Sequence, residues 1–165
     1  MLAEAGARQP PKPGTSQGWH KVPATGLPQR FISDVTTDPN DLKTVYVTLG
    51  ASDLRPYAPP NANGASGEDA GGGHVYKSTD GGRTFHDISA NLEGIPALWS
   101  IVRGHQLLVA TTVGVFASAG TNGGHYDLLG NNLPPAPVFS MQLVPGKPQL
   151  LASSLGRGVY RYTFP

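Results

Sequence analysis

Carboxylates are the residues of this chain with the most evident chemistry. Two carboxylates that face each other across a cleft hydrolyse a glycosidic bond, one as acid and the other as base or nucleophile. The carboxylates that stand outside obvious turn motifs are Asp34, Asp53, Glu68, Asp69, Asp87, Glu93 and Asp127. Their spacing singles out no pair, so the sequence by itself does not predict a hydrolase.

The other residue types that build reactive or charged sites follow no recognisable pattern. The five histidines lack a metal-ligand spacing such as HxxxH, and no cysteine supplies a thiolate, so we expect no metal ion and no cofactor. Lys and Arg number 12 against 11 Asp and Glu, so no net field draws a nucleic acid to the surface. No segment is apolar over the length of a transmembrane helix, and we expect neither a nucleic-acid partner nor membrane insertion.

Three repeated units supply the elements that would position such residues. A first apolar strand follows a Leu/Pro connector in each unit, within 26–35, 91–102 and 132–143. Second strands are predicted at 44–49, 106–112 and 149–155. Third strands, each with an aromatic residue in the same place, are predicted at 74–78, 114–118 and 158–162. The spacing from Leu107 to Leu150 is about 43 residues, the length of a four-stranded propeller blade.

A fourth strand is predicted in the first two units only, at 84–89 and 125–129. Residues 18–22 precede a Gly-Leu-Pro connector, as the other fourth strands precede theirs. We therefore predict that this N-terminal strand closes the last blade, which would remove a free sheet edge. The predicted fold is all-β, with about three four-stranded antiparallel propeller blades.

Two segments do not fit the strand pattern. Residues 1–17 are rich in Pro, Ala and Gly, and we predict a flexible N-terminal lead there. Residues 52–73 are polar and rich in Gly and Pro, which predicts a long surface loop inserted in the first unit. The blades are accordingly predicted to span residues 18–165.

One predicted hairpin, between the third and fourth strands of the first unit, carries the octapeptide STDGGRTF, residues 78–85. We expect Asp80 to accept hydrogen bonds from Ser78 and from backbone amides, because a short carboxylate can reach back into its own turn. Gly82 would supply positive φ, and Phe85 would fold back into the core. The motif is therefore predicted to stabilise the fold rather than to catalyse a reaction.

This octapeptide resembles the Asp-box, the repeat of bacterial neuraminidases, whose pattern is Ser-x-Asp-x-Gly-x-x-Trp with Phe or Tyr allowed last. The segments SLGRGVYRYTF and FISDVTTDPNDLKTVYVTL are similar to a last blade and an early strand pair of Asp-box propellers. The resemblance covers roughly residues 19–165. Such propellers occur in sialidases, xyloglucan-active hydrolases, sortilin-type receptors and photosystem assembly factors, so the resemblance implies the fold more closely than the function.

Asp34 is the best single candidate for a ligand-facing group. The first strands can be aligned on a bulky apolar residue followed by serine, and Asp34 then stands where the other units have Ile101 and Met141. A carboxylate on an innermost strand would face the propeller channel. The alternative interpretation is a solvated strand end.

Trp99 and the insertion loop hold the remaining candidates. In the same alignment Trp99 falls with Ile32 and Phe139, which favours packing between blades over a sugar-stacking platform. Within the loop, Tyr57, Glu68 and Asp69 could rim a binding face, since loops of this length are often functional.

Three blades are too few for a closed propeller, which typically has four to eight. The sequence therefore favours a part of a larger propeller, or a chain that completes a propeller as a homo-oligomer or as a subunit. The favoured function is a non-catalytic module that binds a glycan or a protein or scaffolds a complex, outside the cell or in the periplasm, although no signal peptide is visible in the chain. The alternative is the C-terminal portion of a sialidase-like or xyloglucanase-like glycoside hydrolase. The Arg-Ile-Pro signature that a sialidase resemblance implies is absent.

Overall fold

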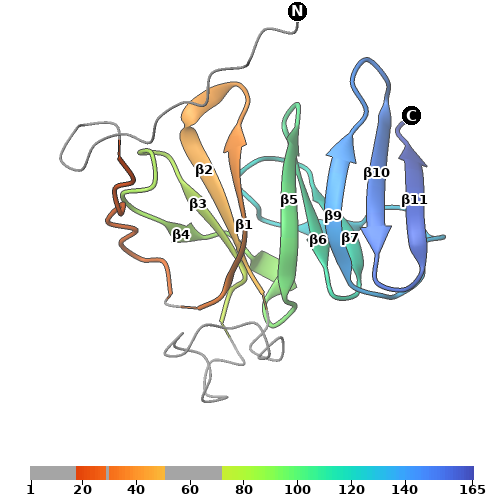
Figure 1. Ribbon diagram of the computed structural model, residues 1–165, viewed down its shortest axis with the longest axis horizontal. Helices are drawn as coiled ribbons and strands as arrows, with labels where there is room; N and C mark the ends of the chain where they lie inside the picture. The colour runs from red at the N-terminus through yellow and green to blue at the C-terminus, as the bar shows by residue number, and fades with distance from the viewer. Residues whose placement is uncertain (1–17, 29, 51–71) are drawn as a thin grey trace, which may run out of the picture.

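The computed structural model describes residues 18–28, 30–50 and 72–165, and within these ranges the chain is all-β. Three antiparallel sheets of four, four and three strands stand side by side (Figure 1). Each sheet is built from consecutive strands, so each repeated unit of the sequence forms one sheet. This confirms the predicted fold class.

The strands follow the predicted units closely. The first sheet contains β1 (Ile32–Asp38), β2 (Asp41–Leu49), β3 (Val75–Ser78) and β4 (His86–Asp87). After the short 3₁₀ helix η2 (Ala90–Leu92), the second sheet contains β5 (Ala97–Arg103), β6 (Gln106–Thr111), β7 (Gly114–Ser118) and β8 (Tyr126–Leu128). The third sheet contains β9 (Val138–Leu143), β10 (Gln149–Ser154) and β11 (Gly158–Thr163).

The third strands show that the units are true structural repeats. Tyr76 lies opposite Val47 in the first sheet, and Phe116 lies opposite Val109 in the second. In the third sheet, Tyr160 holds the same register position opposite Ala152. A valine precedes the aromatic residue in each of these strands, and both residue types are common in β-strands.

The innermost strands share a β-bulge that the sequence alignment missed. The register of β1 shifts between Ile32 and Asp34, and that of β5 shifts between Ala97 and Trp99. A matching shift in the third sheet places the extra residue at Phe139. Because all three strands carry the bulge at the same position, it does not shift one unit against another.

The strand register corrects the alignment of Asp34, because Ser33, Ser100 and Ser140 hold different register positions. The second strands fix the register, and in that register Asp34, opposite Thr48, corresponds to Trp99 and Ser140. The alignment on serine, which matches Asp34 with Ile101 and Met141, is therefore wrong.

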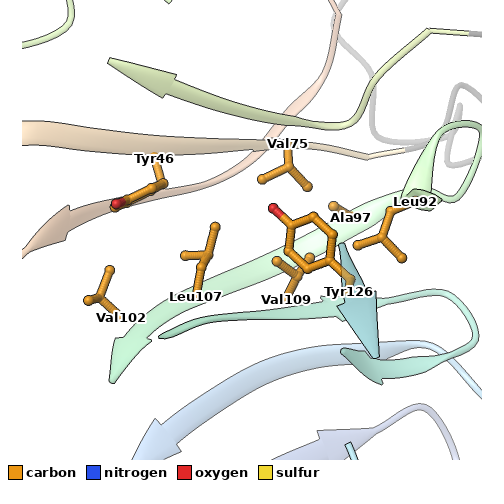
Figure 2. Close-up of a cluster of buried hydrophobic side chains, with 8 residues drawn as sticks. All are labelled: Tyr46, Val75, Leu92, Ala97, Val102, Leu107, Val109 and Tyr126. Atoms are coloured by element: carbon orange, nitrogen blue, oxygen red, sulfur yellow. The ribbon is translucent and has the colours of Figure 1, made fainter. Parts of the chain in front are cut away.

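The core lies between the sheets. β1 packs against β5, and β5 packs against β9, so the first strands of the three sheets lie next to one another. Between the first and second sheets, a buried cluster draws on both (Figure 2): Tyr46, Val75, Leu92, Ala97, Val102, Leu107, Val109 and Tyr126. A second cluster between the second and third sheets includes Leu108, Val138 and Leu150. We call these two regions the first seam and the second seam.

The predicted closure of the third sheet by the N-terminal strand is wrong for this chain. Residues 18–22 form no strand, and within the described residues β11 pairs only with β10. The chain is instead anchored to the first sheet, where the Thr25 amide donates to the Arg83 carbonyl at 2.9 Å and the Phe85 amide donates to the Thr25 carbonyl at 2.8 Å. This anchor lies at the opposite end of the molecule from β11 (Figure 1). Among the described residues, no helix has the length and apolar character needed to span a membrane.

Candidate functional site

Asp34 fastens the innermost strands of the first two sheets together. Its Oδ2 accepts hydrogen bonds from the Ser100 amide and the Ser100 hydroxyl, both at 3.0 Å. The Thr36 hydroxyl lies 3.0 Å from the same oxygen and 2.8 Å from the Ser100 carbonyl. The other carboxylate oxygen, Oδ1, has no protein donor within the described residues. Asp34 is half-buried, so Oδ1 is the part of the group that can accept a hydrogen bond from a ligand.

A second polar contact lies beside Asp34 on the same strands. The Ser33 hydroxyl, on the bulge of β1, donates to the Ala97 carbonyl at 2.7 Å and lies 2.8 Å from the Thr48 hydroxyl. The bulge thereby turns one more side chain toward the neighbouring sheet. The inner edge of the first seam is polar, with each hydroxyl in contact with a partner.

The hairpin of residues 78–85 is held by its serine and aspartate. The Ser78 hydroxyl donates to Asp80 Oδ1 at 2.8 Å and accepts the Gly82 amide at 2.9 Å. Asp80 Oδ1 also accepts the Arg83 and Thr84 amides, each at 2.9 Å, and Oδ2 accepts the Thr84 hydroxyl at 2.6 Å. Hydrogen bonds from the Thr84 hydroxyl and amide, and then from Ser78, hold the pKa of Asp80 far below its usual range. A carboxylate in this state does not act as an acid.

The aromatic end of the hairpin points into the protein. Gly81 and Gly82 have φ of 75° and 87°, which only glycine adopts readily. The turn they form returns the chain so that Phe85 is buried, in a cluster with Val47, Leu49 and Tyr76. The motif residues therefore serve the turn and the core of the first sheet.

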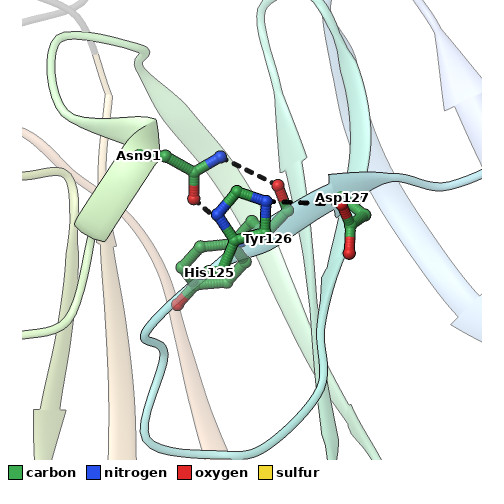
Figure 3. A network of polar contacts seen from close by, with 4 residues as sticks. All are labelled: Asn91, His125, Tyr126 and Asp127. Atoms are coloured by element: carbon green, nitrogen blue, oxygen red, sulfur yellow. Dashed lines mark hydrogen bonds and ion pairs between the residues drawn. The ribbon is translucent and has the colours of Figure 1, made fainter.

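A tyrosine and an asparagine hold the outer part of the first seam (Figure 3). The Asn91 side chain takes both backbone groups of Tyr126, because its Nδ2 donates to the Tyr126 carbonyl at 2.9 Å and its Oδ1 accepts the Tyr126 amide at 2.8 Å. The Tyr126 ring fills the seam, and its hydroxyl donates to the Ile88 carbonyl at 3.0 Å. Burial raises the pKa of the Tyr126 phenol well above its usual value, so the group remains a neutral donor. At the surface, His125 Nε2 lies 3.4 Å from Asp127 Oδ1.

The corresponding place in the second seam is an open groove of about 220 Å³. Its walls include four apolar residues, two tyrosines and an exposed amide, namely Val115, Leu133, Leu150, Ala152, Tyr160, Tyr162 and Asn132. The Asn132 side chain is exposed and has no protein partner among the described residues. The groove is mostly apolar, with aromatic and amide groups at its edge, which suits a bound aromatic residue or sugar ring.

His74 is a buried histidine that the sequence did not single out. Its ring Nδ1 lies 2.8 Å from the Leu49 carbonyl, and its own amide donates to the Ser89 hydroxyl at 2.8 Å. Burial lowers the pKa of His74, and the hydrogen bond to Leu49 opposes that shift only in part. Among the described residues, no three His, Cys, Asp or Glu side chains gather in a way that could hold a metal ion. The His74 side chain therefore acts in the packing of the first sheet.

The structure places only some of the predicted site residues. Tyr57, Glu68 and Asp69 lie outside the described residues. Trp99 packs, partly buried, against the cluster of the second seam, as the packing interpretation predicts. No other carboxylate contacts Asp34 in the part of the chain that the structure describes.

Sequence reasoning also missed the two asparagines. Asn91 and Asn132 both precede a leucine in the connector between units, as Asn91-Leu92 and Asn132-Leu133. This repeated dipeptide is the signal that could have revealed them.

Comparison with known proteins bears on the fold. No family model matches the chain, and no curated protein matches it. Among solved structures, an ancestral GH74 enzyme matches with a TM-score of 0.54 at 21% identity over 76% of this chain. The GH74 enzyme of Niastella koreensis matches with a TM-score of 0.53 at 18% identity over 79% of this chain. The three sheets resemble blades of GH74 propellers.

The resemblance has a limited reach along those enzymes. The matched region covers 14% of the ancestral enzyme and 20% of the Niastella koreensis enzyme. At such identities, the likeness establishes the blade architecture of this chain. The function of these blades depends on their own side chains, because one fold serves many functions.

Proposed function

We propose that this chain is a non-catalytic β-propeller module that binds a glycan or a protein, or scaffolds a complex, as part of a larger or oligomeric assembly. One observation carries the proposal, namely the use of Asp34. Its Oδ2 accepts two hydrogen bonds from Ser100 and joins two blades, whereas Oδ1 has no donor among the described residues and is left to accept a ligand hydroxyl. A group in this position binds a ligand without a second carboxylate to complete an acid–base pair.

Two other carboxylates of the first sheet support the same proposal, because they bond within their own turns. Asp41 accepts the Lys43 amide and the Thr44 hydroxyl, and these hydrogen bonds lower its pKa. Asp87 accepts the Ser89 amide at 2.8 Å. These contacts stabilise turns, and among the residues that the structure describes no second carboxylate lies opposite Asp34.

The alternative function is the C-terminal portion of a glycoside hydrolase propeller. The similarity to two GH74 enzymes favours this alternative. A hydrolase whose chain extends beyond these three blades could place its second carboxylate on another blade, opposite Asp34. Under either function the proposed environment is extracellular or periplasmic, in keeping with the sialidases and receptors that the Asp-box motif resembles, and the proposed partner is a glycan or a protein rather than a nucleic acid or a membrane.

The two functions are separated by measuring binding and turnover on the same material. The chain is run on native gels that contain xyloglucan or a sialylated glycoprotein, and released reducing ends or sialic acid are measured in parallel. We expect retarded migration with no product, and Asp34→Asn should weaken the retardation. Turnover that disappears in Asp34→Asn would instead establish the hydrolase function.

A further inference from the structure

The first seam shows what a fourth strand contributes to the sheet before it. β8 is the fourth strand of the second sheet, and its Tyr126 is buried between the two sheets. The strand is locked by the Asn91 side chain, which takes the amide and the carbonyl of Tyr126. The aromatic residue and the asparagine clamp act together at this place.

The second seam has an equivalent asparagine and matching wall positions, but within the described residues no fourth strand pairs with β11. Asn132-Leu133 stands in its connector where Asn91-Leu92 stands in the first. The wall residues Val115, Leu150 and Ala152 correspond in register to Val75, Leu107 and Val109, which surround the Tyr126 ring in Figure 2. The groove of about 220 Å³ therefore lies where the aromatic residue of a fourth strand for the third sheet would lie.

The fourth strands of this chain have a common pattern, an aromatic residue followed three positions later by an aliphatic residue. The pattern is seen in Phe85 to Ile88 and in Tyr126 to Leu129. The aliphatic residues make equivalent bonds to the third strands, since the Ile88 amide donates to the Val75 carbonyl at 2.9 Å and the Leu129 amide donates to the Val115 carbonyl at 2.8 Å.

The same spacing occurs within β2 and β5, in Tyr46 to Leu49 and Trp99 to Val102, and in one segment that precedes the strands, Trp19 to Val22. Trp19 is fully exposed. An exposed tryptophan in a fourth-strand pattern lacks the packing that its counterparts Phe85 and Tyr126 have.

The same molecule cannot insert this segment into its own groove. Thr25, three residues after Val22, is bonded to the hairpin at the far end of the first sheet. Three residues span at most about 11 Å of extended chain, and the second sheet and strands β9 and β10 lie between that anchor and β11 (Figure 1). The segment must come from another molecule.

We propose that residues 19–22 of a second copy add to β11 as the missing fourth strand, with Trp19 in the groove and its backbone held by Asn132. By the register of the other sheets, Trp19 lies opposite Tyr162, and the Val22 amide donates to the Val159 carbonyl. The groove is large enough, because a cavity of about 150 Å³ already accommodates benzene. Reciprocal exchange between two copies yields a ring of six blades, within the range of closed propellers. This inference rests on the proposed module function and specifies its assembly.

The exposed outer faces of the end sheets fit this arrangement. Leu151 and Val159 are exposed on the face of the third sheet that points away from the second sheet. Val35 is exposed on the first sheet, although its register equivalents Ser100 and Met141 are buried. In the ring, the third sheet of one copy covers Val35 of the other, and this burial adds a hydrophobic contribution to the strand exchange.

The test is the mass of the full chain by light scattering and sedimentation over a concentration series. We expect a species of twice 17.2 kDa, and a dimer dissociation constant about tenfold or more higher in Trp19→Ala, since a buried tryptophan is a typical interface hot spot. Asn132→Ala should weaken the dimer, whereas Asn40→Ala, in the exposed turn between β1 and β2 and outside the groove, should leave it unchanged. In Trp99→Phe, emission from Trp19 should shift to the blue as the dimer forms.

The mass of the chain and the two asparagine variants decide between the ring and a monomer. A single-chain mass at all concentrations, or a dimer equally stable in Asn132→Ala and Asn40→Ala, would overturn the proposal. If Trp19→Ala does not fold, the asparagine pair still decides the question. Glycan binding without turnover in a protein that stays monomeric would retain the module function and reject the ring, so the two failures are distinguishable.

Discussion

The two seams have the same architecture but differ in one element. In the first seam, Tyr126 of the following fourth strand fills the space between the sheets and is clamped by Asn91. In the second seam, the equivalent asparagine, Asn132, is exposed, and an open groove takes the place of the ring. The walls are built from matching strands in both places.

The difference shows that a blade of this kind is completed by its successor. The faces of a sheet form most of the seam, but the outer part needs an aromatic residue that only a fourth strand delivers. Each repeated unit therefore needs a neighbouring unit to cover its apolar face. Substitutions at matched positions of the filled and the open seam should therefore differ in their effect on stability.

Removal of the aromatic residue from the filled seam should have the largest effect. Tyr126→Ala leaves a cavity between the first two sheets and an unpaired Ile88 carbonyl, and should cost about 3–5 kcal/mol of unfolding free energy. Tyr160→Ala, at the edge of the open groove, should cost less than about 2 kcal/mol in the monomer because its ring is only half-buried. Urea denaturation of both variants measures the difference, and equal losses would mean that the seams are packed alike.

Removal of the aromatic residue that begins the fourth strand of the first sheet should have a similar effect on the unfolding free energy. Phe85→Ala empties the cluster that it forms with Val47, Leu49 and Tyr76, and should cost about 3–5 kcal/mol. Thermal and urea unfolding provide the measurement. A loss below about 1 kcal/mol would place the ring at the surface and contradict the account of the hairpin.

The two asparagines should respond differently to alanine substitution. Asn91→Ala leaves the amide and carbonyl of Tyr126 without their partner, and should cost about 1–3 kcal/mol. Asn132→Ala should change the stability of the monomer by less than about 0.5 kcal/mol, because its side chain has no partner in the described protein. Unfolding is followed at a dilution where the chain is monomeric, and a large loss for Asn132→Ala would show an interaction within one chain.

The inner ends of the seams also differ, since Asp34 in the first corresponds to Trp99 in the second. Asp34→Ala removes the acceptor of the Ser100 amide and hydroxyl, and should cost about 1–2 kcal/mol. Asp127→Ala, at an exposed position on β8, serves as a control and should be within about 0.5 kcal/mol of the wild type. Chemical denaturation compares the two, and equal values would deny the carboxylate a role between the blades.

The smallest effect concerns pH and belongs to the first sheet alone. Burial lowers the pKa of His74 below its unfolded value, near 6.5, so the unfolded chain binds more protons than the folded chain in mildly acidic solution. The free energy of unfolding should therefore decrease as the pH falls below about 6.5. His74→Gln should flatten this dependence in urea titrations between pH 7 and pH 5, and an unchanged slope would show that another group is responsible.

Much of the fold could be predicted from the sequence because the signals were local and repeated. The aromatic residues at Tyr76, Phe116 and Tyr160 fixed the third strands, and the glycines at 81 and 82 fixed a hairpin. The candidate site was less predictable. The serines of the inner strands hold different register positions in the three sheets, so an alignment on them matched Asp34 with Ile101 and Met141 instead of Trp99 and Ser140.

The sequence by itself determined the number of units, their strands and the turn chemistry of residues 78–85, because alternation, glycine φ and short polar side chains act over a few neighbouring residues. Only the tertiary structure decided which groups meet across the sheets. It joined Asp34 to Ser100, clamped Tyr126 with Asn91 and anchored residues 24–25 to the first sheet. Such contacts depend on how separate sheets stack, and residues far apart in the chain carry no local pattern that specifies them.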